Sequence, residues 1–162
     1  MHVQQAPQFT LEHIEGHPVS LSDYRGRTVV VVLSGRNSAE QMIAGMNTLR
    51  THYDAEQLPI IAVGDMAGLP RAARALVKRQ LKRRYKDAVE AAAAQLQAAG
   101  KPVPPGPELV IMLPDWEGTV ANSFGLAEVE RDAAMVLIDP EGNVRGYGRG
   151  DQAAEQIMAL FG

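Results

Sequence analysis

The stretch RTVVVVLSGRNSAEQ, residues 27–41, decides the fold. It opens with five consecutive apolar residues, 29–33, most of them β-branched, which is typical of a strand buried on both faces of a sheet. Ser38, with Gln41 three residues later, predicts the start of a helix whose apolar positions recur as far as Tyr53. We therefore expect a central strand that enters a helix through the polar turn 34–37. Ligands bind at such junctions in open α/β sheets.

Three further segments carry a family resemblance. APQFTL at residues 6–11 and VSLSDYRG at 19–26 precede the central strand, and MVLIDPEGNV at 135–144 comes near the end of the chain. They resemble the opening and the late hairpin of the AhpC/TSA peroxiredoxin and TlpA-like branch of the thioredoxin-like superfamily. The resemblance covers most of the chain outside residues 69–107. Residues 35–39, GRNSA, are also similar to a turn of a cysteine-free thioredoxin-like group named for YtfJ.

The resemblance implies an α/β, three-layer thioredoxin-like fold with an N-terminal β-hairpin and a central mixed sheet. It places Ser34 and Asn37 where the family carries its two cysteines, but this chain contains no cysteine. Ala133 or Ala134 stands where thioredoxins have a cis-proline, and Arg131 lies near the position of a peroxiredoxin arginine. Without cysteine the chain has no thiolate nucleophile, no disulfide bond and no Cys-ligated metal.

Composition sets the broad class of the protein. With 162 residues, 46% hydrophobic and 22% charged, the chain fits a single thioredoxin-like domain, 1–162, that needs no disulfide or metal to fold. No apolar run approaches the ~18 residues of a membrane span. The first residues lack the basic and apolar parts of a signal peptide, so we expect a cytoplasmic protein.

The first thirty residues predict a hairpin but no metal site. Residues 9–19 alternate as a β-hairpin, with His13 and His17 beside its Gly-containing turn. Zinc needs three or four ligands, so we interpret both histidines as exposed turn residues. A second buried strand is expected at 58–65, where Asp65 is interpreted as a turn residue.

Residues 70–99 predict one long helix inserted into the fold, bracketed by Pro70 and Gly100. Apolar residues spaced by three or four form one stripe on this helix. These are Ala73, Val77, Leu81, Tyr85, Ala88, Ala92 and Leu96. The candidate partner-binding residues fall mostly on the adjoining face, and they are Arg71, Lys78, Arg79, Lys82, Arg83 and Lys86.

The inserted helix makes the charge of the chain strongly uneven. Residues 71–86 hold eight of the sixteen Lys and Arg residues and no acid, so the net charge of −3 leaves −11 for the rest of the chain. Two interpretations stay open. The basic face either balances an acidic body, its own or that of a second subunit, or binds a polyanion such as nucleic acid or an anionic lipid surface. The pI of 5.8 and the single interleaved aromatic, Tyr85, weigh against nucleic acid.

The remaining third of the chain completes the sheet. Residues 101–107 are rich in proline and predict an extended connector, followed by a strand at 109–113 and a turn at 114–118. A hairpin is expected from 135–138 and 144–147, and Asp151 is expected to cap the last helix. The glycines of residues 146–150 do not match a dinucleotide-binding motif, and we interpret them as strand-exit glycines.

The candidate ligand-binding residues are Ser34, Gly35, Arg36, Asn37, Ser38, Arg131 and Ala133. Free backbone N–H groups at the start of the helix, together with Arg36, would suit a carboxylate, a phosphate or an acidic peptide. Our first hypothesis is therefore a redox-inactive, peroxiredoxin-like protein that binds a protein or a small anion at this junction. The alternatives are an oxidoreductase or antioxidant of the AhpC/TSA class acting without the usual thiol, and a basic-helix module that binds nucleic acid. The sequence predicts no catalytic residue, no metal and no cofactor.

Overall fold

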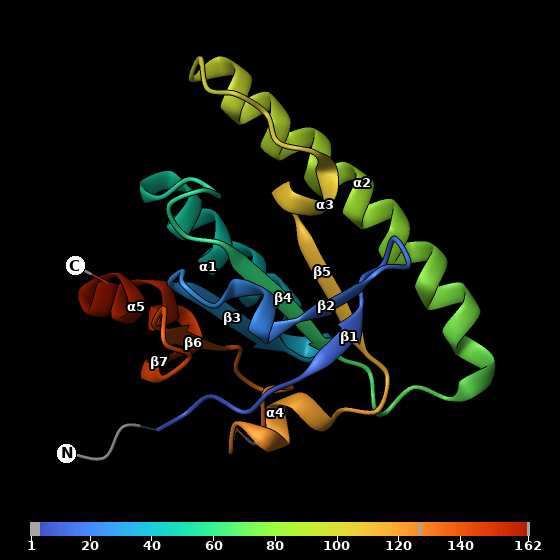
Figure 1. Cartoon of the computed structure of the whole chain (residues 1–162). Coiled ribbons are helices and arrows are strands. Elements are labelled where there is room, and N and C mark those ends of the chain that lie inside the picture. The colour runs from blue at the N-terminus through green and yellow to red at the C-terminus, as the bar shows by residue number, and fades with distance from the viewer. Residues whose placement is uncertain (1–3, 127, 162) are drawn as a thin grey trace.

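The computed structural model describes residues 4–126 and 128–161 and shows a mixed sheet with helices on both of its faces (Figure 1). Five strands lie side by side in the order β5-β4-β3-β6-β7. Their bounds are β3 Val29–Ser34, β4 Ile60–Asp65, β5 Ile111–Asp115, β6 Ala134–Ile138 and β7 Val144–Arg149. A separate hairpin, β1 Thr10–Glu12 and β2 Pro18–Ser20, precedes the sheet. The expected thioredoxin-like α/β architecture is confirmed.

The central strand is β3, as the run of valines predicts. It pairs in parallel with β4, with Val31 opposite Ile61, and antiparallel with β6, with Val31 also opposite Val136. All six residues of β3 are buried. Because β3 and β4 run in parallel, their carboxyl ends lie at the same end of the sheet.

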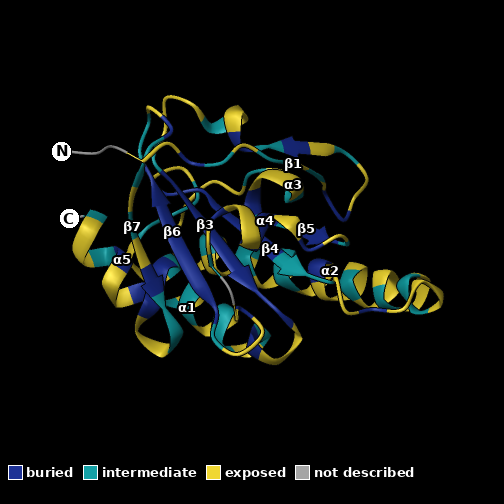
Figure 2. Cartoon of the chain, turned by 90° about the horizontal axis from the view of Figure 1, so that it is seen from below, coloured by how far each residue is buried: buried dark blue, intermediate teal, exposed yellow. Residues whose placement is uncertain are grey.

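The strands of the sheet are largely buried (Figure 2). Their alternate side chains enter two hydrophobic cores, one on each face of the sheet. On one face, Val30 and Val32 pack with Leu49 of α1 (Ala39–His52) and Ile157 of α5 (Ala153–Phe161). The other core contains Val29, Val31 and Leu33, and α4 (Thr119–Ser123), the hairpin and the 3₁₀ turn Leu21–Tyr24 cover it. The continuous run of valines is thus explained by burial on both sides.

The inserted helix is α2, Arg74–Ala98, preceded by the 3₁₀ turn Arg71–Ala73. At ~1.5 Å per residue its 25 residues measure about 37 Å, and it extends beyond the rest of the molecule (Figures 1 and 2). The predicted apolar stripe is the side that contacts the body, and its centre, Tyr85, is only 5% exposed. The six predicted partner-binding residues are all exposed.

The N-terminal segment borders both sides of the sheet. On one side, the Ile14 N–H donates to the carbonyl of Met112 in β5 at 3.0 Å. On the other side, the Val144 N–H at the start of β7 donates to the carbonyl of Gln4 at 2.7 Å. Gln4 and Ile14 therefore occupy backbone groups on both outer strands.

Two local expectations in the second half of the chain are wrong. The connector is extended only as far as Pro105, because α3 forms at Gly106–Leu109, where Pro107 sits in the first turn, the one part of a helix that tolerates proline. Strand β5 therefore starts at Ile111 and not at 109.

The turn before the last helix, Gly150–Gln152, also differs from expectation. The Asp151 carboxylate accepts a hydrogen bond from the Gln41 side chain, so it links α5 to α1 instead of capping α5. Gly146 and Gly148 lie inside β7, where a Cβ would collide with Leu160 and Ala153 of α5. Only Gly150, with φ of 68°, has the left-handed conformation of a strand exit.

Candidate functional site

The candidate site is the junction where β3 ends at Ser34 and α1 begins at Ala39. Gly35 links the strand to a 3₁₀ turn, Arg36–Ser38, that leads directly into α1. A helix start of this kind presents backbone N–H groups that have no partner within the helix. The structure shows where these donors are used.

A carboxylate of the chain itself occupies the start of the helix. Glu130, from the loop before β6, accepts hydrogen bonds from the N–H groups of Arg36 at 3.0 Å and Asn37 at 3.2 Å. The expectation of free backbone donors is therefore wrong. The expected chemistry, a carboxylate held by these N–H groups at the positive end of the helix, is present within the molecule.

The same loop fastens itself to the turn through Val129 and Ser38. The Ser38 hydroxyl donates to the Val129 carbonyl and accepts the N–H of Gly35 at 3.0 Å. Gly35 also donates to Val129 at 3.2 Å. Ser38 occupies the N-cap position of α1, but its side chain does not cap the helix. We call residues 128–130, which lie across the junction, the strap.

Gly35 is required by this close approach. A Cβ at position 35 would overlap both the carboxylate and the Cα of Glu130. The glycine is thus explained by contact with the strap. Its φ of −106° is extended and open to any residue.

Ser34 and Asn37, which the family resemblance puts at the cysteine positions, differ from each other in burial. Ser34 is buried, and its hydroxyl donates to Sδ of Met42 at 3.0 Å. Asn37 is exposed. A serine nucleophile needs a nearby base, yet His52 is at the far end of α1 and His13 is packed against β5. The junction has no catalytic pair among these residues.

The other predicted site residues, Arg131 and Ala133, lie close by, and their backbone N–H groups form hydrogen bonds that hold the loop. The Ala133 N–H donates to the Gln41 side chain at 2.7 Å, and Ala133 is buried. Arg131 is exposed, and its backbone N–H closes the strap by donating to the Glu128 carbonyl. Within residues 4–126 and 128–161 there are no cis peptide bonds.

Arg36 remains the outward-facing cation of the junction. Its side chain is exposed, and within the described residues it forms no ion pair, either with Glu40 or with Glu130. Arg36, Asn37 and Arg131 are therefore the predicted site residues accessible to a ligand, whereas Ser34, Gly35 and Ser38 are enclosed.

The histidine pair of the hairpin packs against α2. His13 is 1% exposed, which contradicts the expectation of two exposed turn residues. Its ring stacks on His17 at 4.5 Å and meets Tyr85 of α2 edge-on at 5.1 Å. Burial lowers the pKa of His13, and the neighbouring His17 adds to this effect, although the hydrogen bond to the Val110 carbonyl opposes it. No group of three or more His, Asp or Glu residues suited to a metal occurs in the part of the chain that the structure describes.

Sequence reasoning missed the strap. Val129 and Glu130 lie more than 90 positions from the turn they contact, and their segment has no apolar periodicity that would predict its place. Gln41 carried a signal, because its spacing from Ser38 suggested a capping pair. In the structure it joins the Ala133 backbone to Asp151.

Solved structures show the class of protein that this fold and site define. The chain is similar to a protein described as thiol:disulfide interchange protein DsbE from Chlorobium tepidum, with a TM-score of 0.63, 22% identity, and coverage of 100% of this chain and 99% of that one. It is also similar to the exposed lipoprotein thioredoxin Etrx1 from Streptococcus pneumoniae, with a TM-score of 0.64, 16% identity, and coverage of 96% and 98%. A third is BsSco, of the Sco family of cytochrome c oxidase assembly proteins, with a TM-score of 0.60, 16% identity, and coverage of 98% and 91%. The fold is thioredoxin-like.

The family follows from the sequence. The model of the AhpC/TSA family matches residues 3–147, and the chain belongs to this family. Among curated proteins, none matches it. It is a cysteine-free member, and no helix in its described residues is long and apolar enough to cross a membrane.

Proposed function

We propose that this chain is a non-redox binding protein that uses the thioredoxin-like fold as a recognition scaffold. The observation that carries the proposal is the junction itself. It has no thiol, and its backbone donors hold the carboxylate of Glu130. Peroxide and disulfide reduction in this family pass through a cysteine thiolate, so the chain lacks the atom on which that chemistry depends.

The proposed ligand is an anionic group that takes the place of Glu130. Two N–H groups at 3.0 and 3.2 Å and the positive end of α1 suit any carboxylate or phosphate oxygen. Arg36, exposed beside them, would add a charge-assisted hydrogen bond. An acidic peptide or a small anion could bind only after the strap moved its carboxylate away.

The first experiment tests for redox activity. The purified protein, freed of metals, should turn over neither hydrogen peroxide nor a dithiol-dependent disulfide substrate above the buffer rate, while a cysteine-containing thioredoxin serves as the positive control for disulfide reduction. Turnover above buffer would overturn the non-redox assignment.

The second experiment tests the anion site with inorganic sulfate. In Glu130→Ala the two N–H groups lose their internal partner, so sulfate should raise the unfolding temperature of this variant more than that of the wild type, with chloride of equal ionic strength as the reference. Adding Arg36→Ala to Glu130→Ala should reduce the gain. Equal sulfate effects on all three proteins would mean that the junction does not bind anions.

A second candidate function follows from one contact. The sulfur of Met42 accepts a hydrogen bond from the Ser34 hydroxyl at 3.0 Å, so a thioether lies beside the residue that the family resemblance puts at a cysteine position. Transfer of one peroxide oxygen to this sulfur would oxidise the thioether to a sulfoxide and release water. Mass spectrometry after peroxide treatment tests it: Met42 should be oxidised faster than Met46, which is also half-buried on α1. Equal rates would exclude this role.

A further inference from the structure

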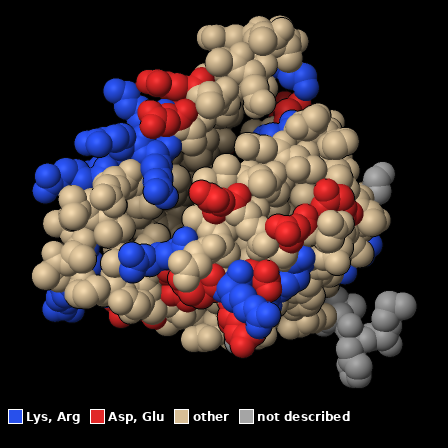
Figure 3. Space-filling view, turned by 180° about the vertical axis from the view of Figure 1, so that it is seen from behind, with Lys and Arg blue, Asp and Glu red and all other residues tan. Residues whose placement is uncertain are grey.

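The first half of α2 carries a dense cationic face, and its nearest acids, Asp87 and Glu90, follow it on the helix. Lys78, Lys82 and Lys86 recur every four residues, so they lie one above another, and Arg79 and Arg83 flank them. All five are exposed, and none forms an ion pair within the described residues. Figure 3 shows Lys and Arg gathered on the side along which α2 runs. We call these five residues the basic face.

An apolar residue lies next to the basic face. Leu76 is 56% exposed, and it precedes Arg79 and Arg83 by three and seven positions, so the three share one side of the helix. A large exposed side chain among cations is typical of a protein interface, where an apolar contact is surrounded by charged groups.

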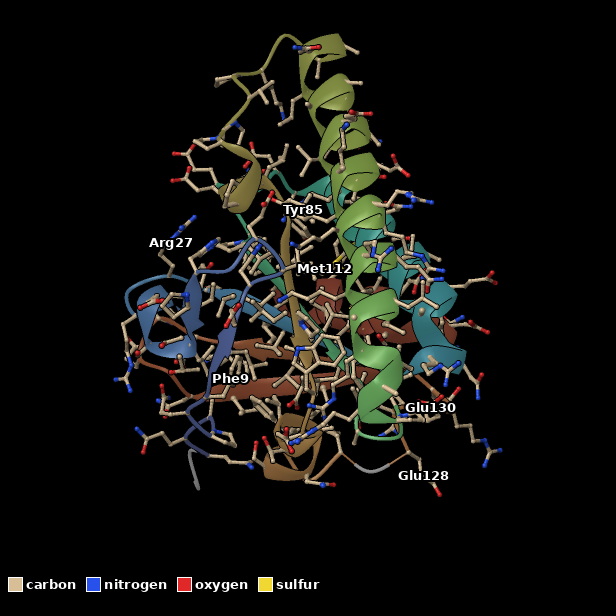
Figure 4. All side chains as sticks on the ribbon, turned by 90° about the vertical axis from the view of Figure 1, so that its right-hand side faces the viewer. Phe9, Arg27, Tyr85, Met112, Glu128 and Glu130 are labelled. Carbon is tan, nitrogen blue, oxygen red and sulfur yellow. The ribbon has the colours of Figure 1, made fainter. Side chains whose placement is uncertain are left out.

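Carboxylates gather around the start of α1. Glu40 is in the first turn of α1, Glu128 and Glu130 belong to the strap, and Asp132 and Asp151 flank Gly150. Glu130 is bonded to the junction and Asp151 to Gln41, so these elements are held together. Figure 4 shows Glu128 extending away from the body. We call these five residues the acidic rim.

The acidic rim has its own apolar neighbour and fewer cations than acids. Ile43, three residues after Glu40 on α1, is 45% exposed. Among the described residues, Arg36, Arg131 and Arg149 lie in the same region, so five carboxylates outnumber three guanidinium groups. The rim therefore resembles the basic face in its pattern, with the opposite charge.

The topology places both patches at one end of the sheet. The rim surrounds the turn after β3, and α2 begins soon after the end of β4, which runs parallel to β3 as its direct neighbour. A two-fold dimer needs complementary patches side by side on one surface, because each patch must meet the other patch of the second copy.

We propose that two copies of this chain associate through this surface. The basic face of each copy docks on the acidic rim of the other, and Leu76 and Ile43 become covered. The chain itself supplies the opposite charge, since it carries −11 outside residues 71–86. That surplus of negative charge repels a nucleic acid over most of the molecule, so a second copy is the occupant that the charges favour.

Charge reversal tests the proposal. The double variant Lys78→Glu, Lys82→Glu should raise the dissociation constant of the dimer at least tenfold in sedimentation equilibrium. The double variant Glu40→Lys, Glu128→Lys should have the same effect. Glu130 stays unchanged because it holds the turn. The two variants mixed together should form a heterodimer, since their altered patches are again opposite in charge. Arg145→Glu with Glu141→Lys, on the β6–β7 hairpin, is the matched control and should dimerise as the wild type does.

Two further measurements test the proposal, one that varies the salt concentration and one that offers the protein a nucleic acid. Raising NaCl from about 0.05 M to about 0.5 M should weaken the wild-type dimer, since exposed charges are screened. A wild type that stays monomeric at all concentrations overturns the proposal, as does a mixture that fails to pair. If the monomer instead binds a labelled DNA duplex, and Lys78→Glu with Lys82→Glu abolishes this, the basic face is a nucleic-acid surface. Redox assays are independent of these results.

Discussion

Glu130 is the residue on which the closed junction depends. Its carboxylate holds two backbone N–H groups at the positive end of α1, so Glu130→Ala leaves both donors to water. Because the side chain is exposed, we expect a loss of only about 1 to 2 kcal/mol in the free energy of unfolding. Urea titration measures it, with the exposed Glu141→Ala as control and an expected change under about 0.5 kcal/mol. Equal losses in the two variants would contradict the capping role.

His13 makes the stability of the protein depend on pH. Its Nδ1 accepts the N–H of Glu15 at 3.0 Å and its Nε2 donates to Val110 at 3.1 Å, which suits the neutral ring. Burial lowers the pKa of His13 below its usual 6.5, so the stabilisation is complete above that pH and declines as the pH falls. His17, Glu15 and Tyr85 are the titratable groups that face it.

The test compares two histidine variants. The free energy of unfolding of the wild type should fall between about pH 7.5 and pH 5, and the fall should be smaller in His13→Gln. His52→Gln, at the exposed end of α1, should behave as the wild type. If His13→Gln loses stability as steeply as the wild type, the pH dependence arises elsewhere.

At the level of single residues, the sequence predicted where the turn lies better than it predicted which residues the turn contacts. The turn was predicted at residues 34–37, with Ser38 as the start of the helix, and the structure has the turn one residue later, at Arg36–Ser38. Their hydrogen-bond partners were unpredictable, because the strap comes from a segment without helix or strand periodicity more than 90 residues away. His13 was misjudged for the same reason, since its burial depends on β5 and α2.

At the level of elements, α2 depends on Tyr85 for its contact with the body. Tyr85 lies where α2 faces β5 (Figure 4), and its ring meets His13. Its hydroxyl is buried, has no hydrogen-bond partner among the described residues, and has a pKa raised by that burial. Tyr85→Phe should therefore keep or raise the stability by up to about 1 kcal/mol, because it removes an unsatisfied polar group. Tyr85→Ala should cost about 3 to 5 kcal/mol through the cavity it leaves. Thermal unfolding of both variants measures the contrast, and a clear loss in Tyr85→Phe would reveal a partner for the hydroxyl.

Elements with strong periodicity were predictable, and short ones were not. The valines of β3 and the stripe of α2 each identified their element and its buried side. The turn at Gly106–Leu109 was missed because proline near a helix start is compatible with both a helix and an extended chain. The glycines of β7 were misread because the reason for them is the close packing of α5, which no local pattern records.

At the level of the whole molecule, the uneven charge and the closed junction belong to one surface. Half of the cations lie on one projecting helix, and the strap brings carboxylates to the neighbouring end of the sheet. The composition revealed the imbalance, but only the parallel pairing of β3 and β4 shows that α1 and the segment leading to α2 start from the same end of the sheet. This cysteine-free chain thus has an ordered, charged surface at the strand-to-helix junction.

The N-terminal segment has a consequence for aggregation. Unpaired backbone groups on the outer strand of a sheet recruit strands from other chains, and here the hydrogen bonds from Ile14 to β5 and from β7 to Gln4 occupy such groups on both outer strands. A protease that removed residues 1–20 would uncover both sides of the sheet in one step. The truncated chain should then form cross-β aggregates, detected by light scattering and dye binding, at concentrations where the intact chain stays clear. A truncated chain that stayed clear would show that these contacts are dispensable. The first twenty residues would therefore act as a built-in guard against fibril formation.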